Sequence, residues 1–205
     1  MIIRFFYNLF CDFGMIDGIA FLMTVLTVSV ICVLSVIIIG FCVDIIEKME
    51  FRLLSFLFNS KTAFLFCNYI TWPGVVVHEL AHALFALLTG ADVQEISFHD
   101  SEKSGRLGHV SYYTRGGYFR RLFQQSLTSC APVIVGCFLV CCLLYALFYQ
   151  IQSVIITVLV WYLLVSVFNH MSMSRTDIIN YIKAVFLLIP FMFFIIAVIA
   201  LFILV

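Results

Sequence analysis

Two histidines and a glutamate, in the order His78-Glu79-Leu80-Ala81-His82, are the residues whose types and spacing could do chemistry. On an α-helix, positions i and i+4 lie on one face about one turn apart, so both imidazoles could bind a single ion. Glu79 stands beside the first ligand, where it could act as a general base on a metal-bound water. The motif therefore predicts a hydrolytic metal site, with His78 and His82 as metal ligands.

The segment around the motif is apolar, which strengthens this prediction. Between residues 62 and 90, Glu79 is the only acidic or basic side chain apart from the two histidines. A charged side chain at the centre of a bilayer costs about 2.5–3.5 kcal/mol on insertion scales, so such residues persist where they pair, face a cavity or bind a metal. The alternative is a satisfied polar cluster between helices, and we favour the metal site over it.

The third ligand of such a site is open between two residues, because a catalytic zinc takes three protein ligands and a water. Asp177 is the better candidate, since it follows a predicted membrane helix and is the only carboxylate after Glu102. His170, seven residues earlier, is the alternative. The other candidates lie in a polar segment where we expect them to be solvated: Asp92, Glu95, His99 and His109.

The composition places these residues in an integral membrane protein. Of the 205 residues, 64% are hydrophobic and 11% are charged, and the mean hydropathy is +1.17. Soluble domains are about 45–50% apolar and about 25% charged, so an ordinary soluble enzyme is excluded. Eleven Lys and Arg balance eleven Asp and Glu, which leaves no basic field for a nucleic acid. Most of the eight cysteines lie in apolar runs, where they behave as small hydrophobes and predict no disulfide framework.

Charge-free stretches predict an all-α polytopic protein, with about five transmembrane helices in a single integral membrane domain over residues 1–205. We expect the mixed-charge stretch 44–61 to be a connector along the interface, and residues 1–13 to be an interfacial segment rather than a removable signal peptide. The predicted spans cover about residues 18–43, 63–89, 122–149, 153–173 and 184–205.

The polar segment 91–121 predicts a small β-hairpin inserted between the second and third spans. Residues 92–99 and 108–113 alternate polar and apolar side chains, and turn-forming residues lie between them. Most of the basic residues fall on the side of the membrane that holds this hairpin and the N-terminus. By the positive-inside rule, we expect the N-terminus and the hairpin to be cytoplasmic.

The motif and the late aspartate together resemble the site-2 protease family of intramembrane zinc metalloproteases, over roughly residues 72–180. In that family a second motif begins with Asn and ends in Leu-Asp-Gly, with the Asn eight positions before the Asp. Asn169 precedes Asp177 by the same interval. The resemblance implies that His78, His82 and Asp177 bind Zn²⁺ and that Glu79 is the catalytic base. It also implies that Asn169 steadies the substrate backbone or the oxyanion.

The second motif departs from the family pattern. Ser172 and Ser174 stand where the family has prolines, and Ile178 stands where a glycine should follow the aspartate. The resemblance further implies that an unwound substrate segment adds as a strand beside residues 105–114. We therefore predict a membrane-embedded zinc metalloprotease that acts on membrane-protein or peptide substrates in the lipid bilayer. The alternative is a metal-binding membrane regulator, or a pseudoprotease without turnover.

Overall fold

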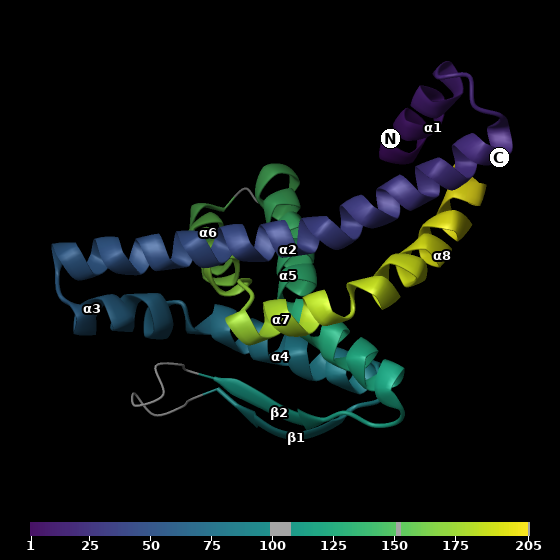
Figure 1. The fold of residues 1–205 in the computed structure, drawn as a ribbon. Coiled ribbons are helices and arrows are strands. Elements are labelled where there is room, and N and C mark those ends of the chain that lie inside the picture. Colours follow the sequence, from purple (N-terminus) through teal and green to yellow (C-terminus); the bar gives the residue numbers. More distant parts are fainter. Residues whose placement is uncertain (99–107, 151–152, 205) are drawn as a thin grey trace.

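Long apolar helices make up most of the chain in the computed structural model, which describes residues 1–98, 108–150 and 153–204 (Figure 1). Three helices of this part are long and apolar enough to cross a membrane, or five spans result if each of two bent helix pairs counts as one. The single helices are α2 (Asp17–Leu57), α5 (Tyr118–Tyr149) and α8 (Val185–Leu204). The predicted class, a polytopic helical membrane protein with a small hairpin, is confirmed.

Each bent pair changes direction at a short break. The first joins α3 (Ser60–Phe64) and the π-helix η1 (Leu65–Ile70) to α4 (Trp72–Leu88) with a bend of 60°. The second joins α6 (Val154–His170) to α7 (Arg175–Lys183) with a bend of 64°. The predicted division of residues 122–173 is present, because α5 ends at Tyr149 and α6 begins at Val154.

Helix α2 continues through the segment where a connector was expected. It runs without interruption from Asp17 to Leu57, because the stretch contains no proline and Lys48 pairs with Asp44 one turn earlier at 2.6 Å. At Gly40 the helix lies close to the α6–α7 break, where a Cβ atom would be 2.8 Å from Cγ of Met173. Helix α2 thus passes beside this break, and its polar end continues the same helix.

The N-terminal helix α1 (Ile2–Asp12) lies with the first half of α2 and the end of α8, as Figure 1 shows. The Arg4 guanidinium donates to the carbonyl of Ile203 at 3.1 Å. Beneath this contact, residues of α2 and α8 form one buried apolar cluster: Val25, Val28, Ile196 and Ala200. Helices α2 and α8 are therefore antiparallel neighbours.

The hairpin consists of β1 (Asp92–Ser97) and β2 (His109–Tyr113), paired antiparallel with an irregularity between Val93 and Glu95. Its base is tied to the neighbouring helices by Gln124, whose side chain accepts from the N–H of Arg115 at 2.9 Å and donates to the carbonyl of Thr89 at 3.0 Å. The predicted hairpin is confirmed, although its turn lies outside the described residues. Both strands contact α4, the helix that carries the histidine motif.

Small side chains let α4 and α5 pack closely. The buried residues of α4 include Ala81, Ala83 and Ala86, and those of α5 include Ser126 and Ser129. Membrane helices associate through such small residues because their backbones can then approach each other. The buried face of α4 is thereby held against α5, and α6 contacts both of these helices.

Candidate metal centre

The start of α4 is fixed against α6 by a close contact between main chains. Gly74 N–H donates to Ser166 Oγ at 2.8 Å, and the same hydroxyl donates to the carbonyl of Thr71 at 2.8 Å. A Cβ atom at Gly74 would be 2.0 Å from the carbonyl oxygen of Ser166, so only glycine fits there. Pro73 lies in the first turn of α4, where its missing N–H is not needed.

His78 and His82 point toward each other one turn apart on α4. Their Nε2 atoms are 3.1 Å apart and their ring centroids are 4.7 Å apart. His82 Nδ1 lies 2.8 Å from the carbonyl oxygen of Thr128, and His78 Nδ1 lies 2.5 Å from that of His170. A carbonyl oxygen only accepts, so we assign the proton of each neutral ring to Nδ1.

This assignment shows how the pair fits a metal ion. With both protons on Nδ1, each Nε2 turns a lone pair toward the other ring. Two nitrogens bound tetrahedrally to one zinc at the usual bond length would lie about 3.3 Å apart, close to the separation of the two Nε2 atoms, 3.1 Å. Hydrogen-bonded Nδ1 atoms are also the usual support of metal-bound histidines. The donor set therefore fits a shared cation.

The histidine pair and Glu79 line a cavity of about 630 Å³ between α2, α4, β2 and the α6–α7 break. Glu79 is buried, with 7% of its surface exposed. The hairpin backbone lies directly against it, since a Cβ atom at Gly108 would be 2.8 Å from Cγ of Glu79 and 3.1 Å from its Oε1. The predicted base is thus enclosed in the same cavity as the two predicted ligands.

Asp177 also lines this cavity, but its carboxylate is engaged in a helix cap. Oδ2 accepts from Ser174 Oγ at 2.5 Å and from Ser174 N–H at 3.1 Å, which makes a reciprocal capping box at the start of α7. Among the residues that the structure describes, no group of three His, Cys, Asp or Glu side chains is close enough to hold a metal ion. The structure brings the two histidines together and places Asp177 on the cavity wall.

Two further predicted residues have partners at the end of α6. His170 lines the cavity, and its Nε2 bonds to Thr71 Oγ1 at 2.8 Å. Thr71 Oγ1 itself donates to the carbonyl of Cys67, so the ring N–H of His170 is the donor to the threonine. Asn169 is buried and donates through Nδ2 to Glu50 Oε2 on α2 at 2.7 Å.

The sequence analysis did not identify the carboxylates of α2 or the tyrosine of β2 as parts of the site. Glu47 accepts from Ser172 at 2.8 Å and lines the cavity. Tyr112 lines it from the hairpin, and burial, followed by the charge of Asp177, raises the pKa of its hydroxyl, which therefore stays protonated at neutral pH. The sequence did offer a signal for the two carboxylates, because Glu47 and Glu50 are spaced by three residues at the polar end of an apolar helix.

The polar residues of the hairpin, which were the remaining candidates for the third metal ligand, have different surroundings. Asp92 forms an ion pair with Arg115, Glu95 is exposed on β1, and His109 borders the main cavity. His99 lies outside the described residues.

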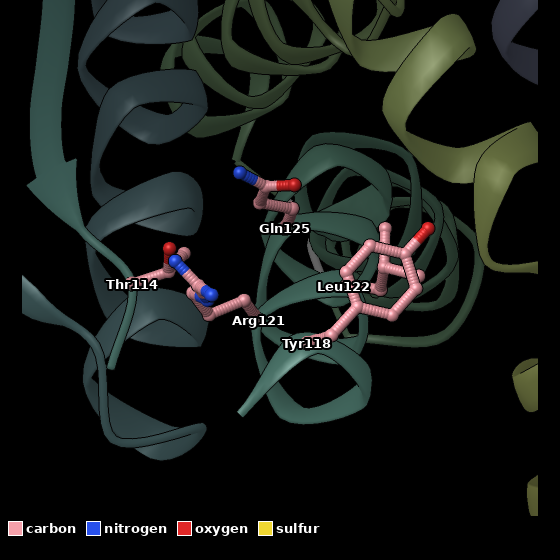
Figure 2. A pocket seen from close by; sticks show the side chains of 5 residues that line it. All are labelled: Thr114, Tyr118, Arg121, Leu122 and Gln125. Carbon is pink, nitrogen blue, oxygen red and sulfur yellow. The ribbon is translucent and has the colours of Figure 1, made fainter. Parts of the chain in front are cut away.

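A second, smaller pocket of about 270 Å³ lies where the hairpin meets the first turns of α5 (Figure 2). Its walls come from the end of the hairpin and from one face of α5, and the lining residues are Thr114, Tyr118, Arg121, Leu122 and Gln125. None of them is a predicted catalytic or metal-binding residue.

Comparison with known proteins identifies the family of the chain. The family model described as Peptidase M50B-like matches residues 53–205, a segment that contains α4, the hairpin and the whole of α5 to α8. No curated protein and no solved structure matches the chain. The match covers most of the sequence, including the histidine motif and Asp177. This chain therefore belongs to the Peptidase M50B-like family, within the site-2 proteases.

Proposed function

We propose that this protein is a membrane-embedded zinc metalloprotease that hydrolyses peptide bonds of membrane-associated substrates. The observation that carries the proposal is the pair of facing Nε2 atoms, 3.1 Å apart, in one cavity with the buried carboxylate of Glu79. His78, His82 and Asp177 would hold the ion. When bound, zinc supplies a Lewis acid that polarises the scissile carbonyl and makes water acidic enough to lose a proton near neutral pH.

In this proposal the residues of the chain perform the proton transfers and the positioning. Glu79 accepts a proton from the attacking water and passes it to the leaving amine. Tyr112, whose hydroxyl stays protonated, is a hydrogen-bond donor on the cavity wall. Asp177 acts as a ligand after its carboxylate turns away from Ser174. The role in substrate or oxyanion binding that the family resemblance gives Asn169 requires release of its amide from Glu50.

The hairpin supports a proposal for how the substrate reaches the cavity. A transmembrane helix shields its own carbonyl groups by hydrogen bonding, so a substrate segment must unwind before attack. We propose that the unwound segment extends beside residues 108–113, which border the catalytic cavity. The distribution of basic residues supports the proposal that this hairpin and the N-terminus lie on the cytoplasmic side.

A metal-binding regulator without turnover is the second candidate function. Two observations favour it: the capping box that engages the Asp177 carboxylate, and Ile178 in place of the glycine of the family motif. The two functions differ in whether Glu79 is needed for peptide cleavage, since both use the histidine pair to hold the metal.

The first experiment measures zinc in detergent-purified protein, and then the cleavage of a pool of quenched fluorescent peptides. We expect about one zinc per chain in the wild type and in His170→Ala, and loss of zinc in Asp177→Ala, because a catalytic zinc site needs three protein ligands beside its water. Glu79→Gln should keep its zinc and lose at least about 100-fold in turnover, as removal of a general base does. A wild type without zinc contradicts the metal site, and undiminished cleavage by Glu79→Gln contradicts the protease.

A further inference from the structure

The carbonyl group that holds His82 lacks its usual hydrogen-bond donor within its own helix. Thr128 lies inside α5, where its carbonyl would ordinarily accept from the N–H of the residue four positions later. That residue is Pro132, which has no N–H. The free carbonyl oxygen instead accepts from His82 Nδ1 at 2.8 Å.

Proline both frees this carbonyl and tilts it. The ring of a proline inside a helix crowds the carbonyl four residues earlier and turns it away from the helix axis. Thr128 and Pro132 are both buried, and a buried carbonyl without a partner costs free energy. The imidazole N–H of His82 removes that cost, so the hydrogen bond missing from α5 and the orientation of His82 depend on each other.

The carbonyl that holds His78 is free for a different reason. His170 is the last residue of α6, and the last four carbonyls of a helix have no intrahelical partner. Its oxygen lies 2.5 Å from His78 Nδ1. Both imidazoles are thus fixed by main-chain oxygens that lack their usual helical donor. One oxygen lies at the end of a helix, and the other lies four residues before a proline.

We propose that Pro132 is a positioning residue of the metal site: by freeing the carbonyl of Thr128, it holds the proton of His82 on Nδ1 and turns Nε2 toward the ion. The inference rests on the proposed function for the identity of the ion, and it assigns a role to a residue of α5 that is outside both sequence motifs. Pro132 is not among the residues that line the cavity, and it acts through Thr128 and His82.

Pro132→Ala is the variant that tests this role. The alanine N–H restores the helical hydrogen bond to the carbonyl of Thr128 and competes with His82 for it. We expect zinc affinity, measured by competition with a chelator, to fall by at least about 10-fold, in the range found when supports of metal ligands are removed. The melting temperature of the zinc-free variant should stay the same or rise, because alanine is far more favourable than proline inside a helix.

Pro190→Ala is the control for the loss of a helix proline, because Pro190 is a second proline inside a membrane helix, on the exposed surface of α8. It should show the same tolerance in melting temperature and leave zinc affinity unchanged. A fall of both affinity and melting temperature in Pro132→Ala would show that Pro132 acts through packing, which overturns the proposal.

A second readout does not need zinc. The chain has five histidines, so ¹⁵N-histidine labelling gives a small set of ring signals. In the zinc-free wild type we expect His82, assigned by its loss in His82→Ala, to show a protonated, hydrogen-bonded Nδ1, and in Pro132→Ala we expect that signature to weaken. Unchanged zinc affinity and an unchanged His82 signal in Pro132→Ala would overturn the inference and leave the metal site standing. A wild type that binds no zinc would instead contradict the proposed function, and the histidine signals alone would then decide the role of Pro132.

Discussion

At the scale of single residues, the site depends on atoms that residue types do not reveal. The HExxH spacing was sufficient to predict that His78 and His82 share one face of α4, and their Nε2 atoms do converge. The oxygens that fix the two rings belong to the main chain of Thr128 and His170, so no side-chain pattern could identify them. The capping role of Asp177 could be predicted from the sequence more easily, because Ser174 precedes it by three positions, as in a capping box.

Gly108 gives a prediction at this scale, because it is the part of the hairpin that lies against Glu79. In Gly108→Ala the new methyl group would lie 2.8 Å from Cγ of Glu79 and 2.9 Å from the carbonyl oxygen of Ser97, so either the carboxylate or the strand must shift. A displacement of about 1 Å in a reacting group can cost about 100-fold in rate. We expect peptide turnover to fall by about 10- to 100-fold while the zinc content stays at the wild-type value.

Gly117→Ala is the control for that substitution, since a Cβ atom at Gly117 meets no atom within 4 Å. Its turnover should equal that of the wild type. Wild-type turnover in Gly108→Ala as well would contradict this prediction. It would mean that the hairpin can shift without loss of activity and that the position of Glu79 does not depend on it.

At the scale of secondary-structure elements, the hairpin was predictable and the length of α2 was not. Alternation of polar and apolar residues on both sides of a turn indicates paired strands whatever surrounds them. The stretch 44–57 carries charges, which mark the end of a lipid-exposed span, but it contains neither proline nor glycine to end the helix. Its carboxylates find partners on the α6–α7 break, and only the folded arrangement shows these contacts.

The contact between α2 and α6 gives a prediction about stability. Glu50→Leu leaves the buried amide of Asn169 without its acceptor, which should lower the free energy of unfolding by about 1–3 kcal/mol. Glu50→Gln keeps an oxygen that can accept from the same amide, so its loss should be smaller. Denaturation in detergent measures both, with Arg52→Gln, on the exposed surface of the same helix, as the control. Equal stability of the wild type and Glu50→Leu would contradict the proposed contribution of this contact.

At the scale of the whole molecule, the packing of the first and last long helices constrains the membrane topology. Val25 and Val28 of α2 pack against Ala200 and Ile196 of α8, and Arg4 bonds to Ile203, so α2 starts where α8 ends. Two antiparallel helices that both cross a bilayer place these two ends on the same side. The number of crossings is then even, whereas hydropathy alone counted about five. If α5 also crosses the bilayer, an even number requires one of the two bent pairs, with bends of 60° and 64°, to turn back within it.

Short epitope tags before Ile2 and after Leu204, in sealed vesicles treated with a protease, test this topology. Because α1 and the end of α8 are in contact, we expect both tags to be cleaved together or protected together, and both to be cleaved once detergent opens the vesicles. Cleavage of one tag with protection of the other would require an odd number of crossings. In that case α2 and α8 could not both cross the bilayer as the antiparallel pair that their buried cluster forms.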